Sequence, residues 1–386
     1  MRSVSIVGVG LTKFGEQWEK SFKELIAEAG IKAIQDSGLE RKDVDAVYGG
    51  CMASGRFVGQ EHIGALIADQ LGLNPVPSTR VEAACASGGV ALRMGYMAVA
   101  SGIHDVVAVG GVEKMTEVST EDAGFALGGA GDQETELFVG ASFPALYALM
   151  ARKHMKKFGT TEEQMASVAV KNHGNAVNNK YAQFHRAITI DNVMNSGYVS
   201  SPLKLLDCSP ITDGAAAVLL MPTEQAKKIN DKAVEIIAST QASDTLALAD
   251  RENLYETKAA KIAGKQAYEQ AGIKPTDVSF AEVHDCFTIA EIMAIESLGF
   301  CPLGEGGKFT EQGNTQLSGQ IPINTSGGLK GKGHPVGATG VAQAIETYLQ
   351  LNGEAGKRQV KDAEIGMTHN VGGSGATAVV HLYKKA

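Results

Sequence analysis

Residues 81–93, VEAACASGGVALR, place one cysteine where an extended, apolar run gives way to a helix-like pattern. The neighbours of Cys85 are alanine, serine and glycine, and a tight strand-to-helix turn that presents a nucleophile requires such small side chains. The N–H groups at the start of a helix also stabilise a thiolate, which is the reactive form of cysteine. A free cysteine is more often a small buried hydrophobe, but this context favours Cys85 as a nucleophile.

A nucleophilic cysteine needs a base, and the second half of the chain offers His334 within INTSGGLKGKGHPVGATG, residues 321–340. His334 precedes a predicted helix of the second half, much as Cys85 precedes one in the first half. The run is not a phosphate-binding loop, because the spacing from Gly327 to Lys332 is one residue short and Gly333 stands where Ser or Thr is required. We therefore interpret His334 as the candidate base.

Two further polar clusters follow predicted strands. VHDCF, residues 283–287, brings His284 and Cys286 to the end of the apolar segment SFAEV, a position where α/β folds place groups that face a ligand. THNVGGSGAT, residues 368–377, supplies the amide of Asn370 and exposed backbone N–H groups at Gly372 and the following glycine. The opening VGVGLTKFG lacks the third glycine of a dinucleotide fingerprint, so the sequence predicts no nicotinamide site.

Short apolar segments alternate with helical patterns in the first part of the chain. The strand-like segments are SIVGVG, DAVYGG, TRVEAAC and DVVAVGGVE, and the helical patterns lie near 20–37, 61–71 and 88–101. This order predicts α/β layers with mainly parallel strands. From residue 119 to about 202 the pattern becomes glycine-rich and then polar and helical, before the strand-like GAAAVLLM near 214, so we expect an inserted domain.

The second half repeats the first. AGIKAIQDSGLERKDVDAV at 29–47 matches AGKQAYEQAGIKPTDVSFA at 263–281 with one constant offset. The matching positions are Ala29, Gly30, Ala33, Gly38, Asp43 and Val44 with Ala263, Gly264, Ala267, Gly272, Asp277 and Val278. Because this match joins two βα-rich halves of similar length, it indicates a duplication, with the active site between the halves.

The composition excludes several classes of protein. The chain has 386 residues, 44% of them hydrophobic, and a net charge of −8, which disfavours a general nucleic-acid surface. No stretch has the length and apolarity of a membrane span, and MRSVSIVGVG lacks the features of a secretion signal, so we expect a soluble, cytoplasmic protein. The 5 cysteines are widely spaced without a CxxC motif, which predicts reduced thiols and no metal site.

Together with Cys85 and GHPVGATG, this duplicated α/β chain resembles the thiolase superfamily over essentially its whole length. The segments similar to the sterol-carrier-protein-type branch, in particular its archaeal acetyl-CoA acetyltransferases, are GGVEKMT, KNHGNAVNNKYAQF, LLDCSPITDGAAAVLL, HDCF and HNVGGSG. The resemblance implies two βαβαβαββ halves in five αβαβα layers. It assigns 1–118 and 203–250 to the N-terminal half, 119–202 to an inserted loop domain that binds coenzyme A, and 251–386 to the C-terminal half.

The resemblance also implies roles for the site residues. Cys85, deprotonated with help from His334, attacks acetyl-CoA, and the backbone N–H groups of Cys85 and Gly372 form an oxyanion hole. His334 and His284 hold the enolate oxygen of a second acetyl-CoA. Standard thiolases carry Asn-Glu-Ala-Phe where this chain has HDCF, and a second catalytic cysteine where it has Asn370, so the resemblance moves the acid/base role to Cys286.

The implied activity is that of an acetyl-CoA C-acetyltransferase, which forms acetoacetyl-CoA and CoA with no cofactor beyond coenzyme A. A degradative 3-ketoacyl-CoA thiolase, another condensing enzyme of this fold and an inactive scaffold subunit are the alternatives. Family members pair as homodimers or tetramers. The resemblance further suggests a place at the start of the mevalonate route, in a complex with 3-hydroxy-3-methylglutaryl-CoA synthase bridged by an OB-fold protein with a zinc ribbon.

Overall fold

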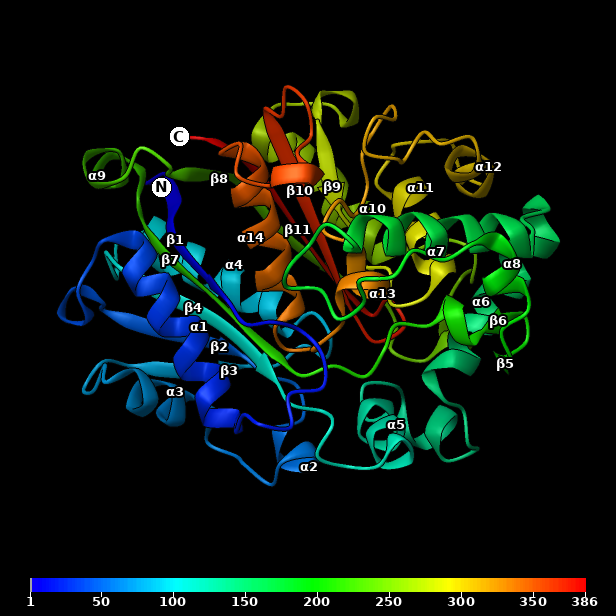
Figure 1. Ribbon diagram of the computed structural model, residues 1–386, viewed down its shortest axis with the longest axis horizontal. Helices are drawn as coiled ribbons and strands as arrows, with labels where there is room; N and C mark the ends of the chain where they lie inside the picture. Colours follow the sequence, from blue (N-terminus) through cyan, green and yellow to red (C-terminus); the bar gives the residue numbers. More distant parts are fainter. Residues whose placement is uncertain (1) are drawn as a thin grey trace.

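The computed structural model describes residues 2–386 and contains a nine-stranded sheet of order β3-β2-β4-β7-β1-β8-β11-β10-β9 (Figure 1). Its strands are β1 (Val4–Leu11), β2 (Ala46–Gly50), β3 (Ser78–Val81), β4 (Val107–Glu113), β7 (Gly214–Pro222), β8 (Val234–Ser243), β9 (Phe280–Glu282), β10 (Ile365–Gly372) and β11 (Thr377–Lys385). A separate two-stranded sheet joins β5 (Tyr198–Ser200) to β6 (Leu203–Lys204).

The helices surround the large sheet and fill the space between its halves. Those of the first half are α1 (Phe22–Ser37), α2 (Ser54–Phe57), α3 (Ile63–Leu71), α4 (Ser87–Ser101) and α9 (Thr223–Ile229). Those of the second half are α10 (Lys258–Ala271), α11 (Thr288–Ser297), α12 (Gly306–Glu311), α13 (Gly328–Lys332) and α14 (Thr339–Leu351). The helical patterns near 20–37, 61–71 and 88–101 are therefore confirmed as α1, α3 and α4.

The expectation of mainly parallel strands is wrong, because the sheet is mixed. Parallel pairs join β2 to β3, β2 to β4 and β9 to β10, whereas β1, β7, β8 and β11 pair antiparallel to their neighbours. A short turn connects β10 to β11, and two strands joined by a short turn must run in opposite directions. Each half thus ends in a strand that lies antiparallel beside the first strand of that half.

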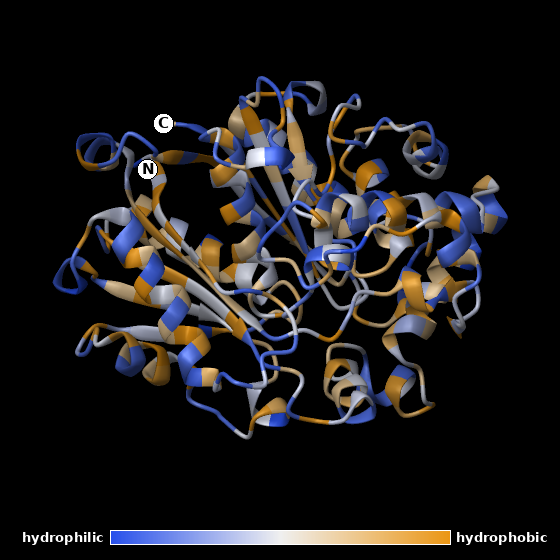
Figure 2. Ribbon diagram, in the orientation of Figure 1, coloured by the Kyte–Doolittle hydropathy of each residue, from blue (hydrophilic) through white to orange (hydrophobic). Residues whose placement is uncertain are grey.

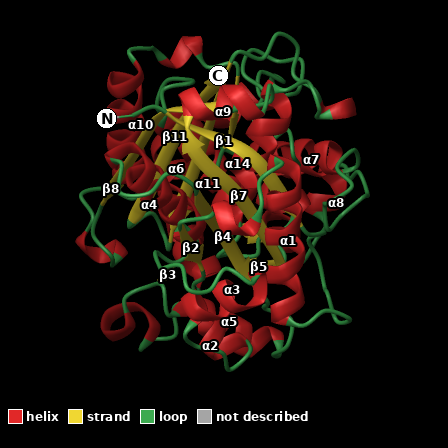
Figure 3. Cartoon of the chain, turned by 90° about the vertical axis from the view of Figure 1, so that its left-hand side faces the viewer, coloured by secondary structure: helices red, strands yellow, loops and turns green. Residues whose placement is uncertain are grey.

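The two halves meet edge to edge and face to face. The first half has the strand order β3-β2-β4-β7-β1, and β1 joins β8 of the second half through the pairs Ser5–Glu235 and Ile6–Val234. The second half has the mirrored order β8-β11-β10-β9 without a counterpart of β3, because the segment beside β9 forms only an isolated bridge between Ala281 and Ile323. The central helices α4 and α14 contact each other and strands of both halves, while α1 and α10 cover the outer faces. Figure 3 shows strands enclosed by helices on both sides. The αβαβα layering is confirmed.

The backbone confirms the internal repeat. Gly38 follows α1 with φ 73° and Gly272 follows α10 with φ 69°, and this left-handed conformation suits glycine. After each glycine, an aspartate caps a short 3-10 turn: the carboxylates of Asp43 and Asp277 each accept a 2.8 Å hydrogen bond from the N–H three residues earlier. The matched sequence positions therefore make matched turns.

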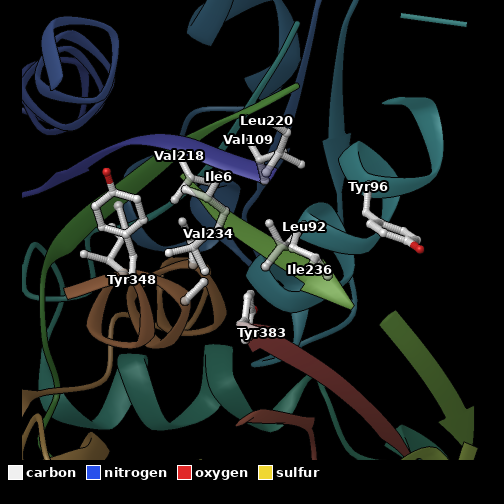
Figure 4. Packing of buried hydrophobic residues seen from close by; sticks show 14 of the residues in the cluster. Ile6, Leu92, Tyr96, Val109, Val218, Leu220, Val234, Ile236, Tyr348 and Tyr383 are labelled. Carbon is white, nitrogen blue, oxygen red and sulfur yellow. The ribbon is translucent and has the colours of Figure 1, made fainter. Parts of the chain in front are cut away.

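One hydrophobic core holds the two halves together. Ile6 of β1, Leu92 of α4, Val234 of β8, Tyr348 of α14 and Tyr383 of β11 belong to a single cluster of fully buried side chains (Figure 4). In Figure 2 hydrophobic colours run along the central strands β1 and β7. Burying one such side chain contributes about 1.5–3 kcal/mol, so this shared core fixes the halves, and any residues between them, in one arrangement.

Glycines allow the first turns of α4 and α14 to approach closely. A Cβ atom on Gly88 would lie 2.6 Å from the carbonyl oxygen of Gly337, and one on Gly50 would lie 2.7 Å from Cα of Gly88. Carbon atoms do not pack at these distances, so only glycine fits. Because Cys85 and His334 stand just before these two helices, the glycine contacts bring the two residues toward each other.

We expect Gly88→Ala to destabilise the protein and to lower its activity. The added methyl group would push the start of α4 away from the backbone at Gly337, and overpacking of this kind costs about 1–3 kcal/mol. Urea unfolding measures the loss. Gly174→Ala is the matched control, since Gly174 lies within helix α7 with open space around its missing Cβ. Equal unfolding midpoints for the two variants would contradict the packing argument.

The segment 119–202 contains α5 (Thr120–Gly128), α6 (Phe143–Phe158), α7 (Glu162–Ala176) and α8 (Ile190–Met194). Although it follows strand β4 of the first half, α6 and α7 pack on α11, and α7 also packs on α13, both helices of the second half (Figure 1). The segment thus lies against the loops that carry the second half's site residues.

Among residues 2–386, no helix is long and apolar enough to cross a membrane.

Candidate active site

Three side chains from distant parts of the chain meet at the starts of the central helices. The sulfur of Cys85 and one ring nitrogen each of His284 and His334 all lie within 4.8 Å of one another. Cys85 precedes α4, His334 precedes α14, and His284 stands between β9 and α11. Cysteine and histidine also bind zinc, but a thiol beside two imidazoles is equally the arrangement of a nucleophile with its base and a hydrogen-bond donor.

The turn that presents Cys85 has a strained backbone. Ala84 has φ 51°, a left-handed conformation that is costly for a residue with a Cβ atom. The hydroxyl of Ser87 holds the turn by accepting from the N–H of Ala83 at 2.9 Å and donating to the carbonyl of Ala84 at 2.6 Å. Strand β3 ends at Val81, earlier than the predicted segment TRVEAAC, because residues 82–86 form this turn.

The thiol form of Cys85 dominates in the free protein. Burial raises the pKa of Cys85 to about 12, and hydrogen bonds from the backbone N–H groups of Gly373 and of Cys85 itself offset only part of that rise. The buried carboxylate of Glu113 adds to it. The start of α4 was expected to favour the thiolate, but here the cost of desolvating the charge is larger than the stabilisation by these N–H groups.

The raised pKa predicts how Cys85 reacts with iodoacetamide. Only the thiolate is alkylated, and far below the pKa its fraction grows roughly tenfold per pH unit. We therefore expect the alkylation rate of Cys85, followed by mass spectrometry, to rise between about pH 6 and about pH 9 without a plateau. The urea-unfolded chain is the control, because its thiols titrate near about 8.5. A plateau at neutral pH in the folded protein would instead show a preformed thiolate–imidazolium pair.

His334 presents a lone pair to the site. Burial lowers its pKa to about 3, so the imidazole is neutral. Its Nδ1 lies 2.7 Å from Oγ1 of Thr339, and that hydroxyl donates its own proton to the carbonyl of Pro335 at 3.0 Å. The hydroxyl therefore accepts from Nδ1–H, and Nε2 keeps its lone pair. Within residues 2–386, Nε2 of His334 has no hydrogen-bond partner, so it is available as a base.

His284 is also neutral and lies edge-on to His334. The two rings are 5.1 Å apart between centroids and inclined by 83°. Burial lowers the pKa of His284 well below its usual range, and the neighbouring His334 and His369 lower it further. The Nδ2 atom of Asn370 lies 3.2 Å from Nδ1 of His284, while Nε2 of His284 has no partner among the described residues.

Cys286 lies beside this trio in an apolar cluster rather than within it. Burial raises the pKa of Cys286 well above its usual range, and the neighbouring hydroxyl of Tyr147 lowers it in part. The hydroxyl of Tyr147 donates its single proton to the carbonyl of Gly373 at 3.0 Å, and its ring packs on the ring of Phe287 with centroids 4.6 Å apart. Cys286 is therefore a thiol in the free protein and needs a proton acceptor before it can act as a base.

The structure adds two groups that the sequence analysis missed. Tyr147 comes from α6 of the inserted segment, and Thr339 sits one turn after His334, where a hydroxyl five residues after a histidine carries little signal by itself. The N–H that points to the Cys85 sulfur is that of Gly373, the second glycine of the predicted pair, whereas the resemblance implied Gly372 as the donor. Gly372 is packed below the turn, where a Cβ atom would clash with the carbonyl of Ala83.

Comparisons with known proteins agree over the full chain. Residues 4–224 match the family model "Thiolase, N-terminal domain", and residues 240–385 match "Thiolase C-terminal domain-like". An acetyl-CoA acetyltransferase of Methanothermobacter thermautotrophicus is 56% identical over 385 residues, covering 100% of both chains. Sterol carrier protein 2 of Bos taurus is 37% identical over 99% of this chain and 72% of its own length.

The solved structure of an "Ltp2-ChsH2(DUF35) aldolase" superposes with a TM-score of 0.86 at 28% identity, covering 98% of this chain and 97% of the other. The similarity therefore extends from sequence to fold and includes the inserted segment. Since the two family models together span nearly all of residues 4–385, and relatives of this identity cover the whole chain, the chain belongs to the thiolase family.

Proposed function

We propose that this protein is an acetyl-CoA C-acetyltransferase that condenses two acetyl-CoA molecules to acetoacetyl-CoA and free CoA. The observation that carries the proposal is the trio of Cys85, His284 and His334, whose reactive atoms lie within 4.8 Å of one another. The name of the 56% identical relative supports the same activity. Coenzyme A enters the site as its acetyl thioester and leaves as free CoA and as acetoacetyl-CoA, and the reaction needs no other cofactor.

The first half-reaction transfers an acetyl group to Cys85. His334 takes the thiol proton through Nε2 while the sulfur attacks the thioester carbon, and the N–H groups at Cys85 and the glycine pair 372–373 stabilise the oxyanion. The C–S bond to CoA then breaks, and the departing thiolate takes the proton of Cys286. This step leaves an acetylated Cys85, a protonated His334 and a thiolate at Cys286.

The second half-reaction forms the carbon–carbon bond. The Cys286 thiolate removes a proton from the α-carbon of a second acetyl-CoA, while protonated His334 and His284 donate hydrogen bonds to the enolate oxygen. The enolate attacks the acetyl group, the C–S bond to Cys85 breaks, and that sulfur recovers the proton from His334. Cys286 ends as a thiol, so every proton is accounted for.

The inserted segment 119–202 is proposed to bind coenzyme A. Helix α6 carries Tyr147 at the site, and one to three turns further along it carries Arg152, Lys153 and Lys156, which line a surface groove. Three cations on one groove suit the phosphates of a nucleotide.

The boundaries of the two halves are also proposed. We propose that residues 1–118 and strand β7 form the first half. The sequence analysis placed the start of the second half at residue 251, but the pairing of β8 with β11 favours a start at β8.

Steady-state turnover with acetyl-CoA, acetoacetyl-CoA plus CoA, and a long 3-ketoacyl-CoA plus CoA tests the proposed activity. We expect turnover with the first two and little with the third. Preferred cleavage of the long substrate would instead identify a degradative 3-ketoacyl-CoA thiolase. Release of an aldehyde from a hydroxyacyl-CoA without any acetylation of Cys85 would identify an aldolase.

We further propose that the protein is a homodimer or tetramer. Strand β3 is the outer strand of the first half, and an unpaired strand edge is a natural surface for two-fold pairing. Sedimentation at micromolar concentration should show at least a dimer, and a monomer would contradict this.

A cytoplasmic location is proposed because the 5 cysteines are free thiols, which a reducing compartment preserves.

A partner enzyme is proposed because condensation of two thioesters is uphill unless its product is removed. We propose that 3-hydroxy-3-methylglutaryl-CoA synthase consumes acetoacetyl-CoA at the start of the mevalonate route, in a complex bridged by an OB-fold protein with a zinc ribbon. The structurally similar Ltp2-ChsH2(DUF35) aldolase is named for two components, which supports an assembly with a second chain. Co-expression of the three chains followed by size-exclusion chromatography tests it, and separate elution would contradict it.

A further inference from the structure

The side-chain amide of Asn370 lies between the nucleophile turn and His284. Its Oδ1 accepts from the N–H of Gly89 at 3.2 Å, and its Nδ2 donates to the carbonyl of Cys85 at 3.0 Å and faces Nδ1 of His284 at 3.2 Å. Asn370 is 2% exposed, so no solvent competes for these contacts. One buried amide of the 368–377 cluster thus contacts the turn of Cys85, the first turn of α4 and His284 of the 283–287 cluster.

The orientation of this amide is fixed by its neighbours. The N–H of Gly89 belongs to the first turn of α4, where backbone donors have no partner within the helix, and Oδ1 satisfies it. With the amide reversed, an NH2 group would face the N–H of Gly89, and its oxygen would face the carbonyl oxygen of Cys85. Both contacts would be repulsive and buried, so Nδ2 is the atom that faces His284.

An amide NH2 can only donate, so Nδ1 of His284 must accept. His284 is neutral in its buried setting and carries a single ring proton, which must then reside on Nε2. Nε2 is the nitrogen without a partner among the described residues. The neighbouring His334 has the opposite tautomer, since Thr339 accepts from its Nδ1. Two imidazoles at one centre therefore present one donor and one lone pair.

We propose that Asn370 is a positioning residue that holds neutral His284 in the Nε2–H form, so that His284 donates a hydrogen bond to the substrate oxygen and cannot serve as a base. The donor role rests on the function proposed above, whereas the tautomer does not. This tautomer leaves proton removal at the centre to another group, for which Cys286 is proposed above. It also means that a zinc ion would find lone pairs only on Cys85 and His334 without a change of tautomer.

Other titratable groups surround His284. His334 faces it from the turn before α14, His369 from β10, and Cys85 from the turn before α4. Tyr147 and His369 line the same small cavity as His284, and Asp285 is its neighbour in sequence. Burial keeps the pKa of His369 at about 3, so His369 stays neutral with the other two histidines.

Nitrogen-15 NMR of the whole protein labelled at histidine tests the proposal directly. Nitrogens with and without a proton have well-separated chemical shifts, and the spectrum of His284→Gln identifies the His284 signals. We expect a protonated Nε2 and an unprotonated Nδ1 in the wild-type protein without substrate. An Nδ1–H signal for His284 would overturn the proposal, whatever the enzyme's activity, and the absence of thiolase turnover with the expected tautomer would overturn only the proposed function.

Asn370→Asp provides the second measurement. An ionised carboxylate only accepts, so we expect it to draw the His284 proton to Nδ1 and to raise the pKa of His284. Below the raised pKa the ring of His284 carries both protons and still donates from Nε2, whereas above it the neutral ring keeps its proton on Nδ1. The condensation rate of this variant should therefore fall as the pH rises through that pKa, at least about tenfold more than the rate of the wild-type protein over the same range. Asn195→Asp, at an exposed helix end, is the matched control. The role of Asn370 would be contradicted if His284 of the variant kept its proton on Nε2 at about pH 8 and the pH dependence of condensation matched that of the wild-type protein.

Discussion

Cys85→Ala abolishes both condensation and thiolysis, with an expected loss on the order of 10⁴ or more, because it removes the atom to which the acetyl group is transferred. The fold should survive, since alanine fits a turn already built from Ala83, Ala84 and Ala86. Incubation with acetyl-CoA followed by peptide mass spectrometry should show an acetyl group on Cys85 in the wild type and none in the variant.

Cys301→Ala is the matched control for the loss of a thiol. Cys301 is buried in a separate hydrophobic cluster of the second half, so its replacement should leave turnover near the wild-type level. An acetyl group found on another cysteine while Cys85 stays unmodified would overturn the central assignment. Near-wild-type condensation by Cys85→Ala would do the same.

Cys286→Ala is expected to separate the two half-reactions. Acetylation of Cys85 needs chiefly His334 and the oxyanion donors, and a CoA thiolate can leave without first being protonated, so acetyl-enzyme should still form. Removal of the α-proton needs the second base, and general acid–base catalysis of this kind contributes about 10²–10⁴ in rate. Rapid-quench measurement of acetyl-Cys85, beside steady-state condensation, checks both halves.

The outcome for Cys286→Ala also tests the histidines. If condensation persists near the wild-type rate, the base lies elsewhere, with His284 and His369 as the nearest groups. The Nε2–H tautomer inferred for His284 excludes it as a base in the resting site, so His369 would then be replaced next. Cys208→Ala is a suitable control, because Cys208 pairs through its backbone with Phe287 and lies outside the trio.

Much of the framework could be predicted from local patterns. Alternating apolar segments and helix-like runs identified β1, β2 and β4 and helices α1, α3 and α4, because each depends on the chemistry of a few consecutive residues. The repeat around Gly38 and Gly272 predicted matched halves. Local pattern did not predict strand direction: whether β7 and β11 run parallel or antiparallel to their neighbours depends on how the chain closes each half.

The sequence by itself determined the candidate chemistry: a cysteine among small residues, a histidine before a matching helix, and two polar clusters after strands. The tertiary structure decided how these groups ionise and which atom of each faces the centre. The pKa of Cys85 is set by burial between the halves, and the tautomer of His284 by Asn370, whose other contacts reach Cys85, 285 positions earlier in the chain. Protonation depends on desolvation and on hydrogen-bond partners brought together by packing, and neither property exists until the two halves and the inserted segment assemble.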